Sequence, residues 1–374
     1  MLNELAVDLA IKSENTELLD VLVKDSPKSL SRDTLLKRAI IASQSTEIIQ
    51  HVLDYGYDIN YKDEEGNTLL HFAAMSFYPE TVRFFISKGL ALEAVNKMGE
   101  TPLFVAAKKN GNPEIIETFI EAGANVKTTC NGGANLLIIA AGFNPNPQIV
   151  NSLLKKGFDI EACDDDGLTA LLSAAAWQRN SDVLDVLIEA GANIGAKTKN
   201  GENLFHLAAC NKSCDVVRYV SLAFSTSDTN DDGSTCLERA LQFGESSEVL
   251  NIYLRKMKEE HVMLACFNEN PEILEALILA GYDPNTIDSY GMSAMMMAAK
   301  VNSNPDVIEM LLYYHAVWDN HDDDGRNVLH YAASNSDPEI YNWMMKDDAF
   351  SKFSSEKDIK GNVPEYYRTH PEDF

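Results

Sequence analysis

Glycines recur along this chain at a nearly constant spacing, and this spacing constrains the fold more than any other feature. Successive intervals are 33, 34, 34, 34, 32, 58 and 34 residues, for Gly66, Gly99, Gly133, Gly167, Gly201, Gly233, Gly291 and Gly325. A period of this length corresponds to one supersecondary unit, which buries its apolar face only against neighbouring copies. The chain is therefore expected to be a repeat array.

The stretch from Asp164 to Ile194 shows how one unit is built. Gly167 follows three aspartates, a combination that favours a tight hairpin turn. Thr169 stands where a helix N-cap is needed, and a short helix rich in leucine and alanine follows it. A second, amphipathic helix starts near Ser181 and is closed by Gly191. Each unit is thus predicted to contain a turn and two helices.

The start of the second helix carries its own signal in several units. An asparagine followed by proline and an acid or glutamine recurs at Asn112, Asn146, Asn270 and Asn304. Asparagine is a good N-cap, proline fits the first helical position, and a carboxylate in the first turn faces the positive end of the helix dipole. These motifs are predicted to be structural.

Two stretches resemble the consensus of the ankyrin repeat. They are Gly99-Glu100-Thr101-Pro102-Leu103 with Ala106-Ala107, and Asn67-Thr68-Leu69-Leu70-His71 with Ala73-Ala74. The resemblance implies an all-α ankyrin-repeat solenoid of about eleven stacked helix pairs with short β-hairpin fingers. It also implies that His71, His206 and His330 support neighbouring turns rather than bind a ligand.

The units are predicted to form one array over residues 1–374. Residues 1–33 would be an N-terminal capping helix pair with a polar outer face, residues 34–346 the repeats, and residues 347–374 a C-terminal cap or tail. Between Gly233 and Gly291 one finger is missing, because residues 256–260 join two helices without a glycine turn. The row of fingers is expected to be interrupted there.

Composition restricts the class of partner. The chain has 31 Lys and Arg against 57 Asp and Glu, a formal charge of −26. Nucleic-acid binding is not expected, since it relies on clustered basic residues, whereas a protein partner with a basic surface would be attracted. The acidic surface also favours a monomer.

Cysteine usage and hydropathy indicate the compartment. The six cysteines show no Cys-x-x-Cys pair or disulfide framework, which indicates reduced thiols. No apolar run is long enough to cross a membrane, and the N-terminus lacks the basic segment of a secretory signal. A cytoplasmic protein is expected, with export as an effector as the alternative.

No motif for catalysis, for a cofactor or for a metal stands out, so an enzyme is not predicted. The segment Asp228–Gly233 is similar to the start of a calcium-binding EF-hand loop, but the acid required at the twelfth position is replaced by Arg239. An acidic hairpin tip is the preferred interpretation, and a weak incidental cation site is the alternative.

The resemblance implies that the finger tips and the first helices form a concave groove. We expect a protein–protein interaction scaffold that binds its partner there; the alternative is a microbial effector or regulator that sequesters or recruits a target through the same face. For Trp177, packing against the adjacent repeat is an equally good interpretation. The residues that the resemblance places on this surface are Glu64, Glu65, Met98, Phe143, Asp165, Asp166, Trp177, Asp231, Asp232, Tyr290, Asp323 and Asp324.

Overall fold

The computed structural model describes the whole chain except residues 1, 26–31, 222–227, 254–256 and 259. Its contacts divide the chain into two compact units, Met1–Lys199 and Asn200–Phe374. We call these unit 1 and unit 2 and describe each separately. The expectation of one continuous array therefore stays a prediction.

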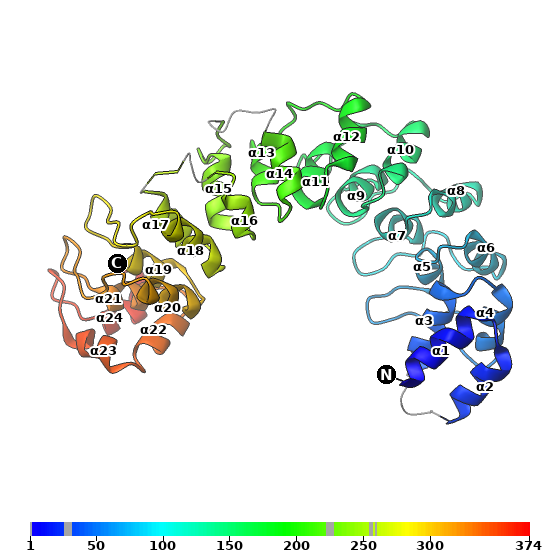
Figure 1. Cartoon of the computed structure of the whole chain (residues 1–374), viewed down its shortest axis with the longest axis horizontal. Helices are drawn as coiled ribbons and strands as arrows, with labels where there is room; N and C mark the ends of the chain where they lie inside the picture. Colours follow the sequence, from blue (N-terminus) through cyan, green and yellow to red (C-terminus); the bar gives the residue numbers. More distant parts are fainter. Residues whose placement is uncertain (1, 26–31, 222–227, 254–256, 259) are drawn as a thin grey trace. The chain divides into compact units, whose positions relative to one another are not determined.

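Unit 1 consists of helices in consecutive pairs (Figure 1). The pairs are α1 (Leu2–Lys12) and α2 (Thr16–Asp25), α3 (Arg32–Ala42) and α4 (Thr46–Leu53), α5 (Leu69–Ala73) and α6 (Pro79–Ser87), α7 (Pro102–Lys109) and α8 (Pro113–Glu121), α9 (Leu136–Phe143) and α10 (Pro147–Lys155), and α11 (Ala170–Trp177) and α12 (Asp182–Glu189).

Unit 2 continues the same pattern (Figure 1). Its pairs are α13 (Leu204–Ala209) and α14 (Cys214–Ser221), α15 (Cys236–Phe243) and α16 (Ser247–Leu250), α17 (His261–Ala265) and α18 (Pro271–Leu279), α19 (Ala294–Val301) and α20 (Pro305–Tyr313), and α21 (Val328–Ser334) and α22 (Glu339–Met344). The terminal helices are α23 (Asp348–Ser351), η2 (Lys352–Ser355), α24 (Pro364–Thr369) and η3 (Pro371–Asp373).

The expected all-α architecture is confirmed. Helices α1–α22 make eleven successive pairs over the described residues, and the fingers hold isolated antiparallel bridges rather than extended strands. These bridges join Lys62 to Thr68, Cys163 to Thr169, Thr229 to Thr235, and Ile287 to Ser293. None of the described helices is both long and apolar enough to cross a membrane.

Small side chains let the first helices of neighbouring repeats pack closely. In unit 1, α9 packs against α7 on one side and α11 on the other, while α10 packs against α8 and α12. Ala140 and Ala174 are fully buried where the first helices meet, beside Leu137 and Leu171. Because each helix pair is flanked by two others, the apolar core is continuous through the unit.

A ladder of buried amide side chains joins consecutive repeats. Asn144 Nδ2 donates to the carbonyls of Ala107 and Asn110, at 2.8 Å each. Gln178 Nε2 donates in turn to the carbonyls of Ala141 and Asn144, at 2.8 and 2.7 Å. These carbonyls end the preceding first helix, where no intrahelical N–H remains to satisfy them. The same position is occupied by Asn110, Asn268, Asn302 and Asn335.

The predicted N-caps of the second helices are confirmed. The Oδ1 atom of each accepts from a backbone N–H in the first helical turn, at 3.0 or 3.1 Å, in Asn112, Asn146, Asn270 and Asn304. Each Nδ2 atom also donates to a carbonyl of the preceding repeat, a bond that the motif did not predict. The cap therefore fixes the spacing between repeats as well as the start of a helix.

Backbone hydrogen bonds also connect the finger tips. In unit 1 the N–H of Lys199 donates to the carbonyl of Asp166 at 2.8 Å, and that of Lys97 to the carbonyl of Glu65 at 2.9 Å. Gly167 has φ +81°, and a Cβ atom there would lie 2.9 Å from the nitrogen of Lys199. Glycine is therefore required both for the turn and for the approach of the next finger.

The three consensus histidines join each first helix to the next finger. His71 Nδ1 accepts from the backbone N–H of Thr68, and Nε2 donates to the carbonyl of Glu100, at 3.0 Å each. His206 and His330 make the equivalent pair of bonds. The ring must be neutral for Nδ1 to accept, and burial lowers the pKa of all three imidazoles.

The first helix departs from the expected polar outer face. Leu5 and Leu9 of α1 are 70% and 63% exposed. They lie one turn apart, so they share one side of the helix. These two side chains make part of the exposed surface of α1 apolar, and the role of residues 1–33 as a cap stays a prediction.

The predicted interruption of the finger row at residues 256–260 falls partly outside the described residues, which lack 256 and 259. Within this segment, the backbone N–H of Lys258 donates to His261 Nδ1 at 2.6 Å, at the start of α17. A histidine thus accepts from the backbone at this helix start too. The missing finger near 256–260 stays a prediction.

Replacing Asn144 with alanine should lower the free energy of unfolding by about 3 kcal/mol, because two buried carbonyls lose their donor. Urea unfolding followed by circular dichroism measures the loss. Asn146→Ala is the matched control and should cost only about 1 kcal/mol, since it removes a more exposed cap. Equal losses for the two variants would contradict a structural role of the ladder.

Below about pH 6.5, the ordinary histidine pKa, the free energy of unfolding should decrease as the pH is lowered. The folded pKa values of His71, His206 and His330 are lowered, so as pH falls the unfolded chain takes up protons that the folded chain does not. We expect a lower thermal midpoint at pH 5.5 than at pH 7.5, and a smaller difference in His71→Gln. The exposed His370→Gln should leave the difference unchanged; if both variants keep the wild-type difference, buried His71 does not contribute to it.

Candidate functional site

Most of the acids predicted at the finger tips are exposed. In unit 1 these are Glu64, Glu65, Asp165 and Asp166, together with Met98, whose side chain is 58% exposed. In unit 2 Asp231, Asp232 and Asp323 are exposed as well. The tips of each unit therefore expose several carboxylates, and their part in binding a partner stays a prediction.

Three of these aspartates lie against the preceding turn. The carboxylate of Asp165 packs on Gly133, in the space that a Cβ atom there would fill. In unit 2, Asp231 packs in the same way on Gly201, and Asp323 lies beside Gly291. Their backbone N–H groups also donate to the preceding tip. Each carboxylate is thus held in place while it stays open to solvent.

Phe143 and Trp177 form a stack at the ends of α9 and α11. Their ring centroids are 5.3 Å apart with planes 20° from parallel. Phe143 is 42% and Trp177 50% exposed. Lys108 Nζ lies 5.1 Å from the Phe143 ring and 2.7 Å from a carboxylate oxygen of Glu100. Trp177 therefore packs against the adjacent repeat and still exposes half its surface to solvent.

Sequence reasoning missed an equivalent aromatic residue in unit 2. Phe243 ends α15 as Phe143 ends α9, and it is 55% exposed. The Arg239 guanidinium lies 4.3 Å from its ring and pairs with Glu202 at 2.8 Å. Aligning every unit on its first-helix end would have found it.

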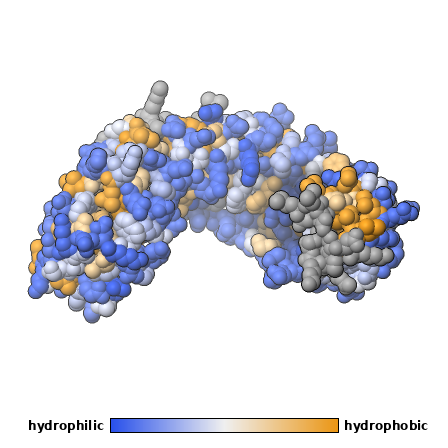
Figure 2. Space-filling view, turned by 60° about the horizontal axis from the view of Figure 1, so that its bottom comes forward, coloured by the Kyte–Doolittle hydropathy of each residue, from blue (hydrophilic) through white to orange (hydrophobic). Residues whose placement is uncertain are grey.

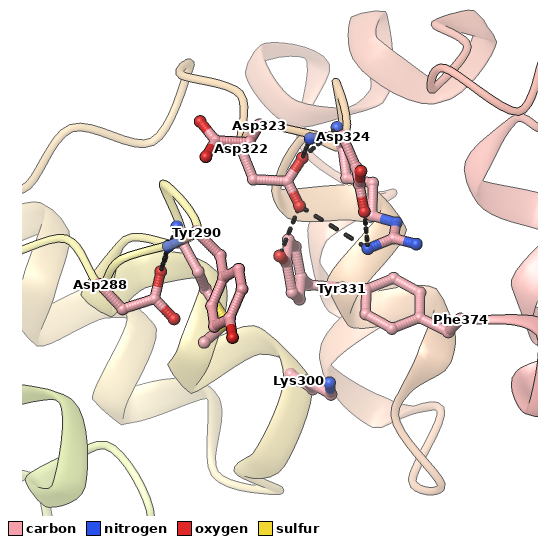
Figure 3. Close-up of a pocket in the computed structure, with 10 residues that line it drawn as sticks. Asp288, Tyr290, Lys300, Asp322, Asp323, Asp324, Tyr331 and Phe374 are labelled. Carbon is pink, nitrogen blue, oxygen red and sulfur yellow. Dashed lines mark hydrogen bonds and ion pairs between the residues drawn. The ribbon is translucent and has the colours of Figure 1, made fainter.

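A recess of about 300 Å³ in unit 2 brings several predicted residues together (Figure 3). It lies between two neighbouring fingers and the first helices α19 and α21. Tyr290, Asp323 and Asp324 line it, whereas Asp231 and Asp232 do not. The lining residues that the sequence did not single out are Asp288, Met292, Lys300, Asp322, Arg326, Tyr331 and Phe374.

One wall of the recess is a hydrogen-bonded carboxylate. Asp322 Oδ1 accepts from the backbone N–H groups of Asp324 and Arg326, and Oδ2 accepts from the Tyr331 hydroxyl at 2.6 Å (Figure 3). Burial and the bond to Asp322 both raise the pKa of Tyr331. Asp324 pairs with Arg326 Nη1 at 2.9 Å, so this half-buried predicted contact is not a free tip acid.

Two acids of the recess pair with no cation in the described part of the chain, and they come from the two neighbouring fingers. They are Asp288, whose Oδ1 atom accepts from the backbone N–H groups of Tyr290 and Met292, and Asp323. Tyr290, which is 73% exposed, lies on the same finger as Asp288. The fingers thus bring an open aromatic ring and two negative charges without an ion-pair partner to the recess.

Two cations of the recess lie at the Phe374 ring. Lys300 Nζ, from α19, and the Arg326 guanidinium, from the finger before α21, lie 4.8 and 4.5 Å from this ring. Burial, together with the positive charge of Arg326, lowers the pKa of Lys300. The recess thus has acids at the finger tips and two cations around the ring of Phe374.

The described residues contain no group of three or more His, Cys, Asp or Glu side chains arranged for a metal ion. What the fingers and first helices present is an open surface of fixed acids and aromatic rings. Figure 2, which colours one face by hydropathy, shows hydrophilic residues broken by small hydrophobic patches. Such a surface suits binding of another macromolecule.

The family comparison decides the classification. The family model described as "Ankyrin repeats (3 copies)" matches residues 36–130, 103–198, 137–231 and 262–354. The chain belongs to the ankyrin repeat family. Ankyrin repeat domains generally mediate protein–protein interactions and are usually non-catalytic.

Curated relatives match short parts of this ankyrin repeat protein. Human protein phosphatase 1 regulatory subunit 27 is 37% identical over 62 residues, which cover 17% of this chain and 40% of that protein. A putative ankyrin repeat protein of Rickettsia bellii is 30% identical over 112 residues, covering 28% of this chain and 62% of its own. The chain therefore spans less than two thirds of each of these relatives.

Among solved structures, the human ASB11 ankyrin repeat domain matches with a TM-score of 0.46 at 20% sequence identity, covering 58% of this chain and 96% of that domain.

Tyr331→Phe should lower the free energy of unfolding by about 1.5 kcal/mol, because the buried Asp322 carboxylate loses a hydroxyl donor. Thermal and urea unfolding measure this change. Tyr290→Phe, on the exposed finger of the same recess, is the matched control and should change stability by less than about 0.5 kcal/mol. A neutral Tyr331→Phe would show that this wall does not depend on the hydrogen bond.

Proposed function

We propose that this ankyrin repeat protein is a non-enzymatic scaffold in the cytoplasm that binds a partner protein through its finger tips and groove. The partner presents a basic surface. The observation that carries this proposal is the placement of Asp165, Asp231 and Asp323, each exposed and each packed on a turn glycine of the preceding finger. Together with a net charge of −26, these acids attract and orient a basic partner.

Preorganisation supports the same proposal. Backbone hydrogen bonds between consecutive tips hold the carboxylates before a partner arrives, as between Asp165 and Gly132 at 2.9 Å. Binding then costs little loop ordering, which is a large part of the usual entropic cost of association. A flexible acidic loop would lack this advantage.

Aromatic anchors lie on the first helices beside the acidic tips. Phe143 and Trp177 expose about half their surface while the stack between them keeps both rings in place. Aromatic residues held in this way are common centres of interface energy, with charged residues around them. We therefore assign the apolar part of the interface to this pair in unit 1 and to Tyr290 in unit 2.

The test is capture of partners from lysate at low and moderate salt with the variant Asp165→Asn, Asp231→Asn, Asp323→Asn. At about 0.5 kcal/mol for each exposed charge pair, binding should weaken roughly tenfold, and wild-type binding should fall with salt. The matched control is Glu121→Gln, Glu189→Gln, Glu309→Gln, which removes three exposed charges from the second helices. Equal weakening by both variants, or by neither, contradicts recognition at the finger tips.

A further inference from the structure

The end of the chain lies in the recess of unit 2. The Phe374 side chain lies against the Tyr331 and Tyr367 rings, with centroids 4.9 and 5.1 Å away, and beside the two cations Lys300 and Arg326 (Figure 3). We propose that this position is a receptor for an aromatic side chain of a partner segment, and that Phe374 occupies it until the partner displaces it. The inference rests on the proposed function, in which the groove is the binding face.

The chemistry of the position favours an aromatic guest. Two cations next to one ring attract the negative faces of its π system, and an aliphatic side chain offers no such face. Lys300 forms no ion pair with a carboxylate in the described part of the chain. Its ammonium group lies 4.8 Å from the Phe374 ring and 5.9 Å from the Tyr331 ring, so Phe374 is the nearer of its two aromatic neighbours. The lowered pKa of Lys300 agrees with its partial removal from water.

Few hydrogen bonds join the segment that carries Phe374 to the rest of unit 2. Residues 370–373 are exposed, and their backbone N–H bonds, like that of Phe374, stay within residues 366–374. Lys360 Nζ donates to the Asp373 carbonyl at 2.9 Å, and Tyr366 to the Asp373 carboxylate at 2.5 Å. Phe374 is thus the one side chain of this segment that enters the recess.

The C-terminal cap is also held by contacts that do not involve Phe374. Tyr367 of α24 is fully buried, and its hydroxyl donates to the Asp358 carboxylate. The backbone N–H of Ile359 donates to the carbonyl of Asp324, which attaches the cap to the preceding finger. Release of Phe374 therefore opens the recess and leaves the cap in place.

The charges of the recess indicate which kind of residue would lie near the aromatic residue in the partner segment. Asp288 and Asp323 lie on the fingers, unpaired with any described cation, while Lys300 of α19 and Arg326 of the second finger lie at the Phe374 ring. An extended partner segment would place its aromatic residue beside these two cations and a basic residue at the finger tips. This arrangement joins the aromatic receptor to the acidic row without a second binding face.

The experiment uses a labelled peptide with the sequence of residues 368–374, which contains Phe374 but neither Tyr366 nor Tyr367, as the probe, titrated into the full chain and followed by fluorescence anisotropy. Phe374→Ala protein should bind it at least tenfold more tightly than wild type, because the tethered Phe374 competes at a high effective concentration. A peptide with alanine in place of its phenylalanine should not bind. Adding Lys300→Met to Phe374→Ala should weaken binding of the original peptide severalfold.

Two control variants distinguish an effect of Phe374 in the recess from an effect on folding. Phe374→Leu keeps an apolar group but no π face, so it should bind the peptide more tightly than wild type does, even if Phe374→Ala unfolds. Tyr313→Ala removes a 75% exposed aromatic residue from α20, outside the recess, and should bind the peptide as wild type does. Circular dichroism confirms that each variant is folded.

Equal binding by wild type and both Phe374 variants, no binding by any of them, or equal binding of the alanine peptide would each overturn the inference. The probe is part of this chain, so its result does not depend on the partner captured from lysate. Peptide binding without any captured partner would contradict the proposed function alone, whereas capture at the finger tips without peptide binding would contradict the aromatic receptor alone.

Discussion

The buried amide ladder is the interaction on which the spacing of the repeats depends. A first helix of only five to eleven residues leaves its last carbonyls without partners, and stacking removes those carbonyls from water. Asn144 and its equivalents donate two hydrogen bonds each to such carbonyls of the preceding repeat. Because a short amide reaches only one distance and direction, every ladder bond sets the position of one repeat on the next.

That spacing determines the geometry of the proposed binding surface. Consecutive fingers stand close enough for backbone hydrogen bonds between their tips, and the acids lie against the turn glycines. Like charges at this density repel one another and would spread a flexible loop. The bonded row of fingers resists this repulsion, and the surface keeps a strong negative field in a fixed arrangement.

The exposed aromatic groups differ between the two units. Unit 1 presents the Phe143–Trp177 stack, whereas unit 2 presents a recess with Tyr290 at its mouth and Phe374 inside. Acids attract any basic partner at long range, but a ring must fit a cavity of definite shape. In the proposed function, the rings therefore provide selectivity among basic partners, and the carboxylates provide attraction.

The sequence by itself determined the repeat period, the helix caps at Asn112 and its equivalents, and the exposure of tip acids such as Asp165, because turns and caps depend on residues within one unit. Only the tertiary structure decided that Asp324 is paired with Arg326, that Trp177 stacks on Phe143, and that Phe374 enters the recess. The stack of Trp177 on Phe143 and the entry of Phe374 into the recess bring together residues 34 or more positions apart. The pairing of Asp324 with Arg326 depends on the direction in which the long arginine side chain extends. The sequence spacing does not specify these contacts, because they follow from how the packed repeats orient their side chains.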